Sequence, residues 1–126
     1  ADGPRPRATV SMAAVTGVGI IEVINVRACL GGMISPVVTA TLEVHRDVVR
    51  GLRWLGRQPR LVTFSCRKEK HGWKNTIVVT DMRSRRSTPF REVGPEVSPM
   101  LAIRSSPSGR HLLVLFRGAP SEIWVM

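Results

Sequence analysis

The feature that most constrains the fold is a series of short β-rich runs that occurs twice in the same order. In the first copy, residues 48–54, 60–64 and 76–81 are rich in Val, Leu and other strand formers. A Gly- and Pro-containing turn at residues 56–59 and a polar stretch at residues 67–75 separate them. This punctuation predicts an antiparallel meander.

The second copy repeats the pattern through residues 101–104, 111–116 and 122–125, with a Ser-Pro-Ser-Gly turn at residues 106–109. Thr80 and Trp124 occupy equivalent places in the two copies. A period of about 40–45 residues with four strands per unit is typical of propeller blades. The repeat therefore predicts blade-like sheets that stack side by side.

The remaining segments also read as strands and turns. Two apolar runs around Thr16 and Gly17 predict a hairpin, and the alternation in residues 37–44 predicts a half-exposed strand. Residues 27–36 are expected to form a turn-rich connector, and residues 111–116, apolar on both faces, predict a sheet covered on both sides. No stretch has the apolar spacing of an amphipathic helix, so the predicted fold class is all-β.

The net charge of the chain indicates anionic partners but does not say which kind. The formal net charge is +10, from 19 Lys and Arg against 9 Asp and Glu, which favours polyanions of any kind. The densest basic groups lie in predicted turns, where they form either solvated loop ends or an anion-binding patch. They are Arg67 and Lys68 with Lys70, and Arg83 with Arg85 and Arg86.

Two cysteines and the absence of a glycosylation sequon favour a reducing compartment on the cytosolic side. The first apolar run, which follows Arg5 and Arg7, admits a secretory signal as a competing interpretation. Gly17, Gly19 and Glu22 interrupt that run, and it is shorter than the roughly 20 residues of a membrane span. We therefore predict no membrane span.

No motif for metal binding, catalysis or cofactor binding emerges. The five candidate metal ligands lack paired spacing, and we expect them to be packing or loop residues: Cys29, His45, Cys66, His71 and His111. Ser108 lies in a Pro-Gly turn, the glycines at 17 and 19 lack the rest of a phosphate-binding loop, and Glu92 and Glu96 are expected in a solvated loop. The sequence predicts no catalytic residue, no metal and no cofactor.

The three tryptophans differ in context. Trp54 and Trp124 lie on predicted strands and are expected to be buried against a neighbouring sheet. Trp73 lies in a basic stretch that is predicted to be a loop. It is either an exposed anchor for a partner or a side chain that folds back over its own blade.

Several short motifs resemble the WD-repeat family. Val44-His45 stands where the family has Gly-His, Thr80-Asp81 where it has Trp-Asp, and Trp124 keeps the Trp. Residues 48–56 (VVRGLRWLG), 60–65 (RLVTFS) and 105–126 (SSPSGRHLLVLFRGAPSEIWVM) are similar to the large WD-repeat protein eleven family, especially its plant members. The resemblance covers residues 19–126.

This resemblance implies a partial β-propeller of about two and a half four-stranded antiparallel WD-like blades. Residues 1–8 would be a flexible N-terminal segment, and the blade pieces would be about 9–43, 44–93 and 94–126. The resemblance also implies a buried hydrogen-bonded network, incomplete here because Thr80 replaces the family's Trp. The WD-like positions are His45, Thr63, Ser65, Thr80, Asp81 and Trp124.

An incomplete ring exposes apolar surface at both ends. We therefore expect marginal stability alone, or association with a second copy or with the remainder of the propeller.

For function, the resemblance implies a non-enzymatic protein-interaction scaffold, a fragment of a vesicle-tethering or trafficking adaptor. Such a protein would be cytoplasmic and peripheral at Golgi or endosomal vesicles, with tethering subunits and acidic segments as partners. The candidate partner-binding loop comprises Arg67, Lys68, Lys70, Trp73 and Lys74.

Two alternatives stay open. One is a small basic nucleic-acid-binding protein, which rests on charge alone because the strands lack paired aromatics that would stack bases. Nucleic-acid binding is otherwise expected to be non-specific. The other is a truncated product without an independent function.

Overall fold

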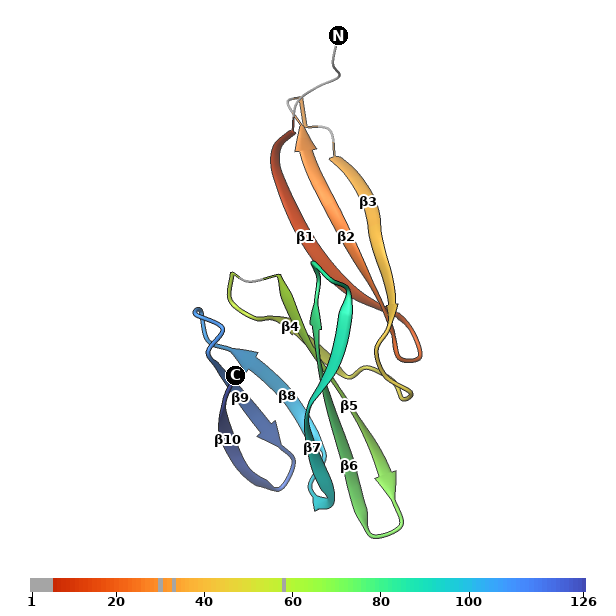
Figure 1. The fold of residues 1–126 in the computed structure, drawn as a ribbon, viewed down its shortest axis with the longest axis vertical. Helices are drawn as coiled ribbons and strands as arrows, with labels where there is room; N and C mark the ends of the chain where they lie inside the picture. Colours follow the sequence, from red (N-terminus) through yellow and green to blue (C-terminus); the bar gives the residue numbers. More distant parts are fainter. Residues whose placement is uncertain (1–5, 30, 33, 58) are drawn as a thin grey trace.

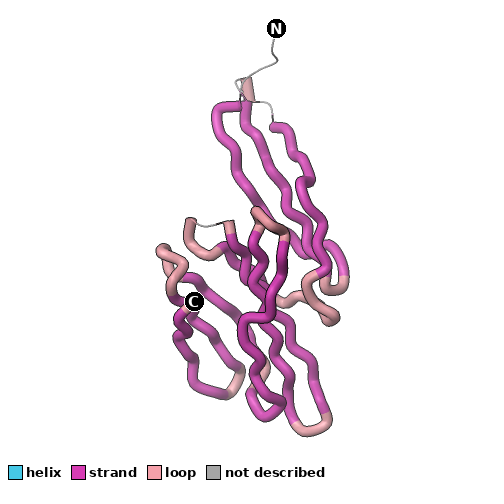
Figure 2. Tube along the Cα trace, viewed as in Figure 1, coloured by secondary structure: helices cyan, strands magenta, loops and turns pink. Residues whose placement is uncertain are grey.

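The computed structural model describes residues 6–29, 31–32, 34–57 and 59–126, and these residues form strands, turns and loops without a helix (Figure 2). The all-β prediction is confirmed. Within this described part of the chain, ten strands follow one another (Figure 1). They are β1 (Pro6–Gly17), β2 (Ile20–Cys29), β3 (Ile34–Glu43), β4 (Gly51–Trp54), β5 (Arg60–Glu69), β6 (Gly72–Asp81), β7 (Arg86–Val97), β8 (Met100–Ser105), β9 (His111–Phe116) and β10 (Ala119–Val125).

The strands form three antiparallel meanders: an N-terminal sheet of order β1-β2-β3, a central sheet of order β4-β5-β6-β7, and a C-terminal sheet of order β10-β9-β8. Among the described residues, only the central sheet has the four strands of a complete blade. The C-terminal sheet lies beside the central sheet, whereas the N-terminal sheet extends away from it at one end (Figure 1). This arrangement is a partial β-propeller, as predicted.

Strand β5 shows why the central sheet is covered on both faces. Leu61 belongs to the core shared with the N-terminal sheet, while Val62 and Phe64 belong to the core shared with the C-terminal sheet. Because successive side chains of a strand point to opposite faces, Thr63 and Ser65 share the face of Leu61. The run from Leu61 to Cys66 is buried throughout, as expected for a strand inside stacked sheets.

The larger core lies between the central and C-terminal sheets. It combines apolar side chains of both sheets: Leu55, Val62, Phe64, Ile77, Met100, Ile103, Leu112, Val114, Phe116 and Trp124. Ser105 donates its hydroxyl proton to the Trp54 carbonyl at 2.7 Å, and the rings of Phe90 and Trp124 lie 6.4 Å apart. Burial of Trp124 agrees with the prediction for that residue.

The junction between the N-terminal and central sheets is smaller. Ile21 of β2 meets Val49 and Leu61, with the half-buried Trp54 packed at the edge. The Gly19 carbonyl accepts hydrogen bonds from the Val44 and His45 amides at 2.8 and 3.3 Å. Trp54 therefore packs on a neighbouring sheet, although it is only partly covered.

One more bond spans this junction. Arg85 Nη2 donates to the Thr39 carbonyl of β3 at 3.0 Å, from the turn between β6 and β7. Arg85 itself has a φ of 59°. These hydrogen bonds join the N-terminal sheet to the central one near one end of the N-terminal sheet.

Several expected loops are strands. β5 continues to Glu69 and β6 begins at Gly72, so residues 67–75 form a tight hairpin rather than a loop. The prediction was wrong because the backbone pairing of β5 with β6 continues through this polar stretch, from Arg67 opposite Lys74 to Glu69 opposite Gly72.

Residues 27–36 likewise extend β2 and β3, with the chain reversing between Cys29 and Ile34. Glu92 and Glu96 fall within β7, not in a loop. The local sequence does not indicate a strand here, and the strand forms because β7 pairs with β6. β1 begins at Pro6, within the segment 1–8 that was expected to be flexible, and residues 1–5 lie outside the described residues.

Strand β9 also departs from expectation. Leu112, Val114 and Phe116 are buried against the central sheet, but Leu115 on the opposite face is exposed. The second face has no sheet over it among the described residues. A strand with apolar residues on both faces is therefore not necessarily covered on both faces.

Candidate functional site

The candidate site is built around His45, a buried residue in the connector between β3 and β4. The connector passes over β5, and the His45 side chain is 7% exposed. Its Nε2 lies 2.8 Å from Thr63 Oγ1, and its Nδ1 lies 3.1 Å from Ser65 Oγ. Thr63 Oγ1 in turn donates to the Val78 carbonyl of β6 at 3.4 Å.

The direction of these bonds defines the tautomer of His45. When the single Thr63 hydroxyl proton is given to the Val78 carbonyl, Thr63 Oγ1 accepts a hydrogen bond from His45 Nε2–H. Nδ1 is then the acceptor, and Ser65 donates to it. The network is a one-way chain of donors that holds a neutral imidazole.

The electrostatics of the site also favour the neutral ring. Burial lowers the pKa of His45 below its ordinary value of 6.5, while a hydrogen bond to the Thr63 backbone and the charge of Asp47 act in the opposite direction. A neutral, buried and fully bonded histidine is suited to joining a connector to two strands.

The other WD-like positions lie apart from this network. Thr80 Oγ1 is 2.8 Å from Ser87 Oγ on β7, and Trp124 Nε1 donates to Glu122 Oε2 at 3.0 Å. Asp81 Oδ1 accepts the Arg83 and Ser84 amides at 2.8 and 3.4 Å and so closes the turn after β6. The structure therefore brings together His45, Thr63 and Ser65 but not the remaining three.

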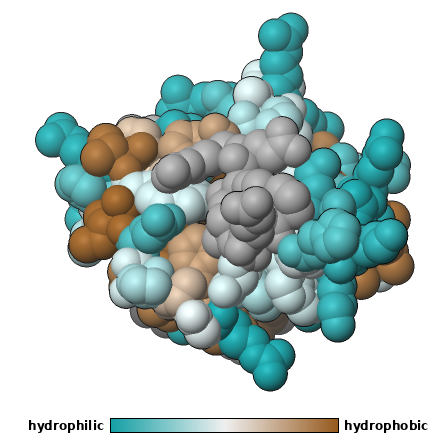
Figure 3. Space-filling model, turned by 90° about the horizontal axis from the view of Figure 1, so that it is seen from below, coloured by the Kyte–Doolittle hydropathy of each residue, from teal (hydrophilic) through white to brown (hydrophobic). Residues whose placement is uncertain are grey.

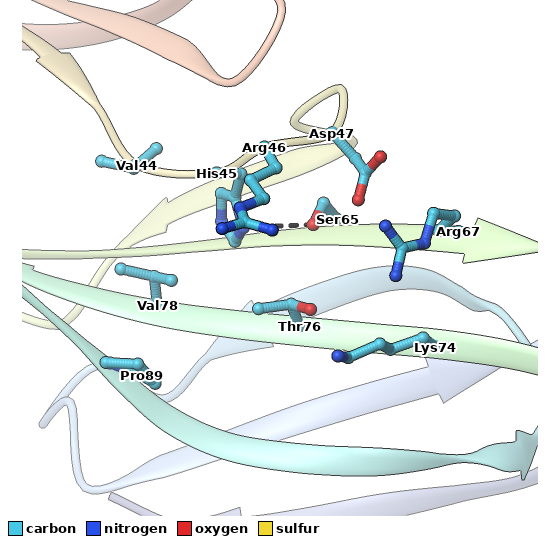
Figure 4. Close-up of a pocket in the computed structure, with 10 residues that line it drawn as sticks. All are labelled: Val44, His45, Arg46, Asp47, Ser65, Arg67, Lys74, Thr76, Val78 and Pro89. Carbon is cyan, nitrogen blue, oxygen red and sulfur yellow. Dashed lines mark hydrogen bonds between the residues drawn. The ribbon is translucent and has the colours of Figure 1, made fainter.

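A pocket of about 380 Å³ opens beside His45 (Figure 4). The connector forms one wall, and β5, β6 and β7 form the base. Its lining combines aliphatic, hydroxyl and charged side chains: Val44, His45, Arg46, Asp47, Ser65, Arg67, Lys74, Thr76, Val78 and Pro89.

Positive charge dominates the mouth of this pocket. In Figure 4, Arg46, Arg67 and Lys74 lie around it, with Asp47 as the single carboxylate. Arg67 Nη2 also forms a 3.1 Å ion pair with Glu69, both being partly exposed to solvent. Such a surface can receive an anionic group through charge-assisted hydrogen bonds.

The candidate partner-binding residues are divided between two faces. Arg67 and Lys74 are paired across β5 and β6 and line the pocket. Lys68 and Trp73 form the next pair, so their side chains point to the opposite face. Trp73 is half-buried on β6 and not in a loop, and Lys70 lies in the turn.

The end of the molecule that carries this hairpin is seen in Figure 3. Hydrophilic side chains project around its periphery, and hydrophobic patches lie between them. Arg67, Lys68 and Lys70 are exposed there. The end therefore combines positive charge with accessible apolar surface.

Asn75 is a structural residue that the sequence does not reveal. It is fully buried, its Nδ2 donates to the Ser98 carbonyl at 2.9 Å, and its Oδ1 accepts the Met100 amide at 3.0 Å. The side chain thus joins β6 to the link between β7 and β8. An Asn in a polar run resembles a turn residue, and no local signal distinguishes it.

The described residues contain no group of three or more His, Cys, Asp or Glu placed to hold a metal ion. Cys66 is a buried free cysteine, and burial raises the pKa of its thiol, which disfavours the reactive thiolate. The Cys29 side chain lies outside what the structure describes.

Comparison with known families agrees with the geometry of neighbouring antiparallel meanders. A search of curated proteins found no match. The profile of the family described as WDR11 second beta-propeller matches residues 1–126. The chain therefore belongs to the WDR11 second beta-propeller family.

Proposed function

We propose that this chain is a non-enzymatic protein-interaction scaffold, in which stacked blades display loops and hairpin ends to partner proteins. Family membership supports a scaffold, because propellers commonly present binding surfaces on rigid blades. The single observation that carries the proposal is the β5–β6 end, where Arg46, Arg67 and Lys74 surround a pocket lined by aliphatic and hydroxyl side chains.

The chemistry of this end favours acidic partner segments. Arg67 and Lys74 at the pocket, with Lys68 and Lys70 at the hairpin tip, would attract carboxylates and guide their approach. The half-buried Trp73 next to Lys68 adds aromatic surface on the other face. An acidic segment would follow the hairpin tip with one side chain in the pocket.

At the cellular level, we propose a vesicle-tethering or trafficking adaptor that works in the cytoplasm, peripheral to Golgi or endosomal vesicles. This rests on the resemblance to the large WD-repeat protein eleven family. In the described residues, no helix has the length and apolar character needed to cross a membrane. Tethering or adaptor subunits are the proposed partners, together with the remainder of a propeller.

The test is capture of tethering and adaptor proteins by the folded chain and by a longer chain that carries further blades. The structure supplies a matched pair of variants with the same change of charge. Arg67→Glu with Lys70→Glu alters the pocket and the hairpin tip of the β5–β6 end, while Arg83→Glu with Arg110→Glu alters exposed turns at the other end of the strands.

We expect the first variant to lose about ten-fold or more in partner affinity and the second to lose much less. Failure of a correctly folded longer chain to enrich any tethering protein would refute the trafficking assignment. Equal losses in both variants would refute the assignment of the site.

The net charge of +10 favours nucleic-acid binding as a second candidate function. A filter-binding titration separates the two. Affinity that disappears by about 150 mM salt indicates non-specific attraction to polyanions, whereas specific binding at that salt would favour this second function.

A further inference from the structure

Four Ser-Pro or Thr-Pro steps occur in the chain, and one of them differs from the others. Ser35, Ser98 and Ser106 precede prolines but have no basic residue at the third following position. Thr88-Pro89 is followed by Phe90 and Arg91. Thr88 is thus the only hydroxyl in the sequence that combines a following proline with a cation three residues on.

Thr88 is also placed where another protein can reach it. It lies on β7, an edge strand of the central sheet, which is bonded to β6 on one side. Its side chain is exposed, as are those of the residues on either side of it. An extended, exposed edge strand has the shape in which a peptide enters an enzyme cleft.

The pairing of β7 with β6 is interrupted at this point. Val78 pairs with Pro89 and Ile77 with Arg91, so Phe90 is an extra, bulged residue. Pro89 has no N–H to donate to β6. Because bulges and missing bonds lower the cost of local opening, residues 88–91 can separate from β6 more easily than the rest of the strand.

From these observations, we propose that Thr88 is a phosphorylation site for a proline-directed protein kinase. Proline after the acceptor suits a cleft that offers no acceptor for the following N–H, since proline alone lacks that group. Arg91 supplies the positive charge that such enzymes read as part of a charge pattern.

The reaction is a phosphoryl transfer from magnesium-bound ATP. Thr88 Oγ1 attacks the γ-phosphorus, the bond from that phosphorus to the β–γ bridging oxygen breaks, and ADP leaves. The hydroxyl proton passes to the general base of the kinase. The product carries a phosphate of about −1.5 to −2 charge on β7.

The new charge would fall beside the junction of the central and C-terminal sheets. Thr88 pairs with Val79, which packs on the core between these sheets, and Phe90 contacts Trp124. Arg86, two residues before Thr88, lies on the same face of β7. The phosphate would pair with Arg86 and change the surroundings of the Phe90–Trp124 contact.

The experiment treats the folded 126-residue chain with a purified cyclin-dependent kinase and magnesium-ATP, and maps phosphate by mass spectrometry. The three Ser-Pro steps are internal controls. We expect Thr88 to be modified about ten-fold faster than Ser35, Ser98 or Ser106, as an added charge-assisted contact allows.

Three variants sharpen the test. Thr88→Val keeps the shape of the strand and should abolish this incorporation, Pro89→Ala should slow it about ten-fold, and Arg91→Gln should slow it several-fold. Phosphorylation of Thr88 should change the surroundings of Trp124. The tryptophan emission of the wild type should therefore change on kinase treatment, and that of Thr88→Val should not.

Two outcomes would overturn the proposal. One is phosphate spread evenly over the four steps. The other is rapid phosphorylation of a peptide of residues 83–95 while Thr88 in the folded chain stays unmodified. That result would show that the folded strand keeps the Thr88 hydroxyl out of reach of the kinase.

Discussion

At the scale of single residues, Asn75 connects two sheets through one buried amide. Replacing it with Ala leaves the Ser98 carbonyl and the Met100 amide without their bonds to this side chain. We expect Asn75→Ala to lower the free energy of unfolding by about 2–4 kcal/mol, since each orphaned buried group costs about 1–3 kcal/mol. Urea denaturation measures this loss.

The matched control is Asn25→Ala. Asn25 Oδ1 accepts a bond from Ser11 Oγ at an exposed site, so its loss should cost no more than about 0.5 kcal/mol. Equal costs for the two variants would contradict the bridging role of Asn75.

His45 gives stability a pH dependence. Burial holds its pKa below 6.5 in the folded chain, so below pH 6.5 the unfolded chain binds the proton more readily. The stability contributed by the neutral ring is present above this pH and declines as the pH falls toward the lowered pKa, by at most about 1.4 kcal/mol per pH unit. Unfolding measured from pH 8 to pH 5 should show this decline.

His45→Gln should be less stable at neutral pH and should lose this part of the pH dependence. His111→Gln, which changes an exposed histidine at the start of β9, should retain it. Parallel pH profiles for the wild type and His45→Gln would show that His45 does not cause the decline.

At the scale of elements, the turn after β8 packs tightly against the loop after β4. Gly109 has a φ of +73°, and a Cβ there would lie 2.9 Å from the Leu55 carbonyl oxygen. Gly118, in the turn after β9, has a φ of +74° with nothing within 4 Å of a Cβ. Comparing substitutions at these two glycines therefore separates the cost of backbone strain from the cost of disturbing the close contact between the loops.

We expect Gly118→Ala to cost about 1–2 kcal/mol, the price of a left-handed conformation for a residue with a Cβ. Gly109→Ala should cost about 1–3 kcal/mol more, because the loops must move apart. Thermal or urea unfolding compares them. A smaller cost at Gly109 than at Gly118 would mean that the loop contact contributes nothing.

At the scale of the whole molecule, the outer sheets present apolar faces to solvent. On the N-terminal sheet, Val10, Met12 and Val38 share one exposed face, Met12 being 53% exposed. On the C-terminal sheet, Ile123 and Val125 are 70% and 75% exposed. Apolar faces of this kind are covered by a neighbouring sheet in a complete propeller.

We expect the isolated chain to associate as its concentration rises, as sedimentation velocity would show. Met12→Lys with Ile123→Lys should weaken association at both ends, whereas Ser11→Lys with Ser121→Lys adds the same charge at nearby exposed positions and should weaken it less. A cooperative, monomeric melt at high temperature would contradict exposed and adhesive ends.

Much of the fold follows from local sequence because alternation and turn residues act over a few positions. The hairpin of β1 and β2, the Ser-Pro-Ser-Gly turn and the strands of the second copy were all predicted in place. The strands at residues 67–75 and 86–97 were missed. Their polar and Pro-Gly sequences become strands because β5 and β6 supply partners.

The site was predicted less completely than the fold. Resemblance to a family indicated His45, Thr63 and Ser65, which the structure brings within hydrogen-bonding distance. Asn75 was missed, and the basic residues were expected on one loop. Their division between two faces depends on the cross-strand register, which spacing along the chain does not reveal.

The sequence by itself determined the all-β class, the order of most strands and the basic charge, because these depend on residues close together in the chain. Only the tertiary structure decided which polar residues are buried bridges and which cations share a face. Those properties depend on contacts between strands and sheets that are distant in sequence, and on the burial that these contacts create.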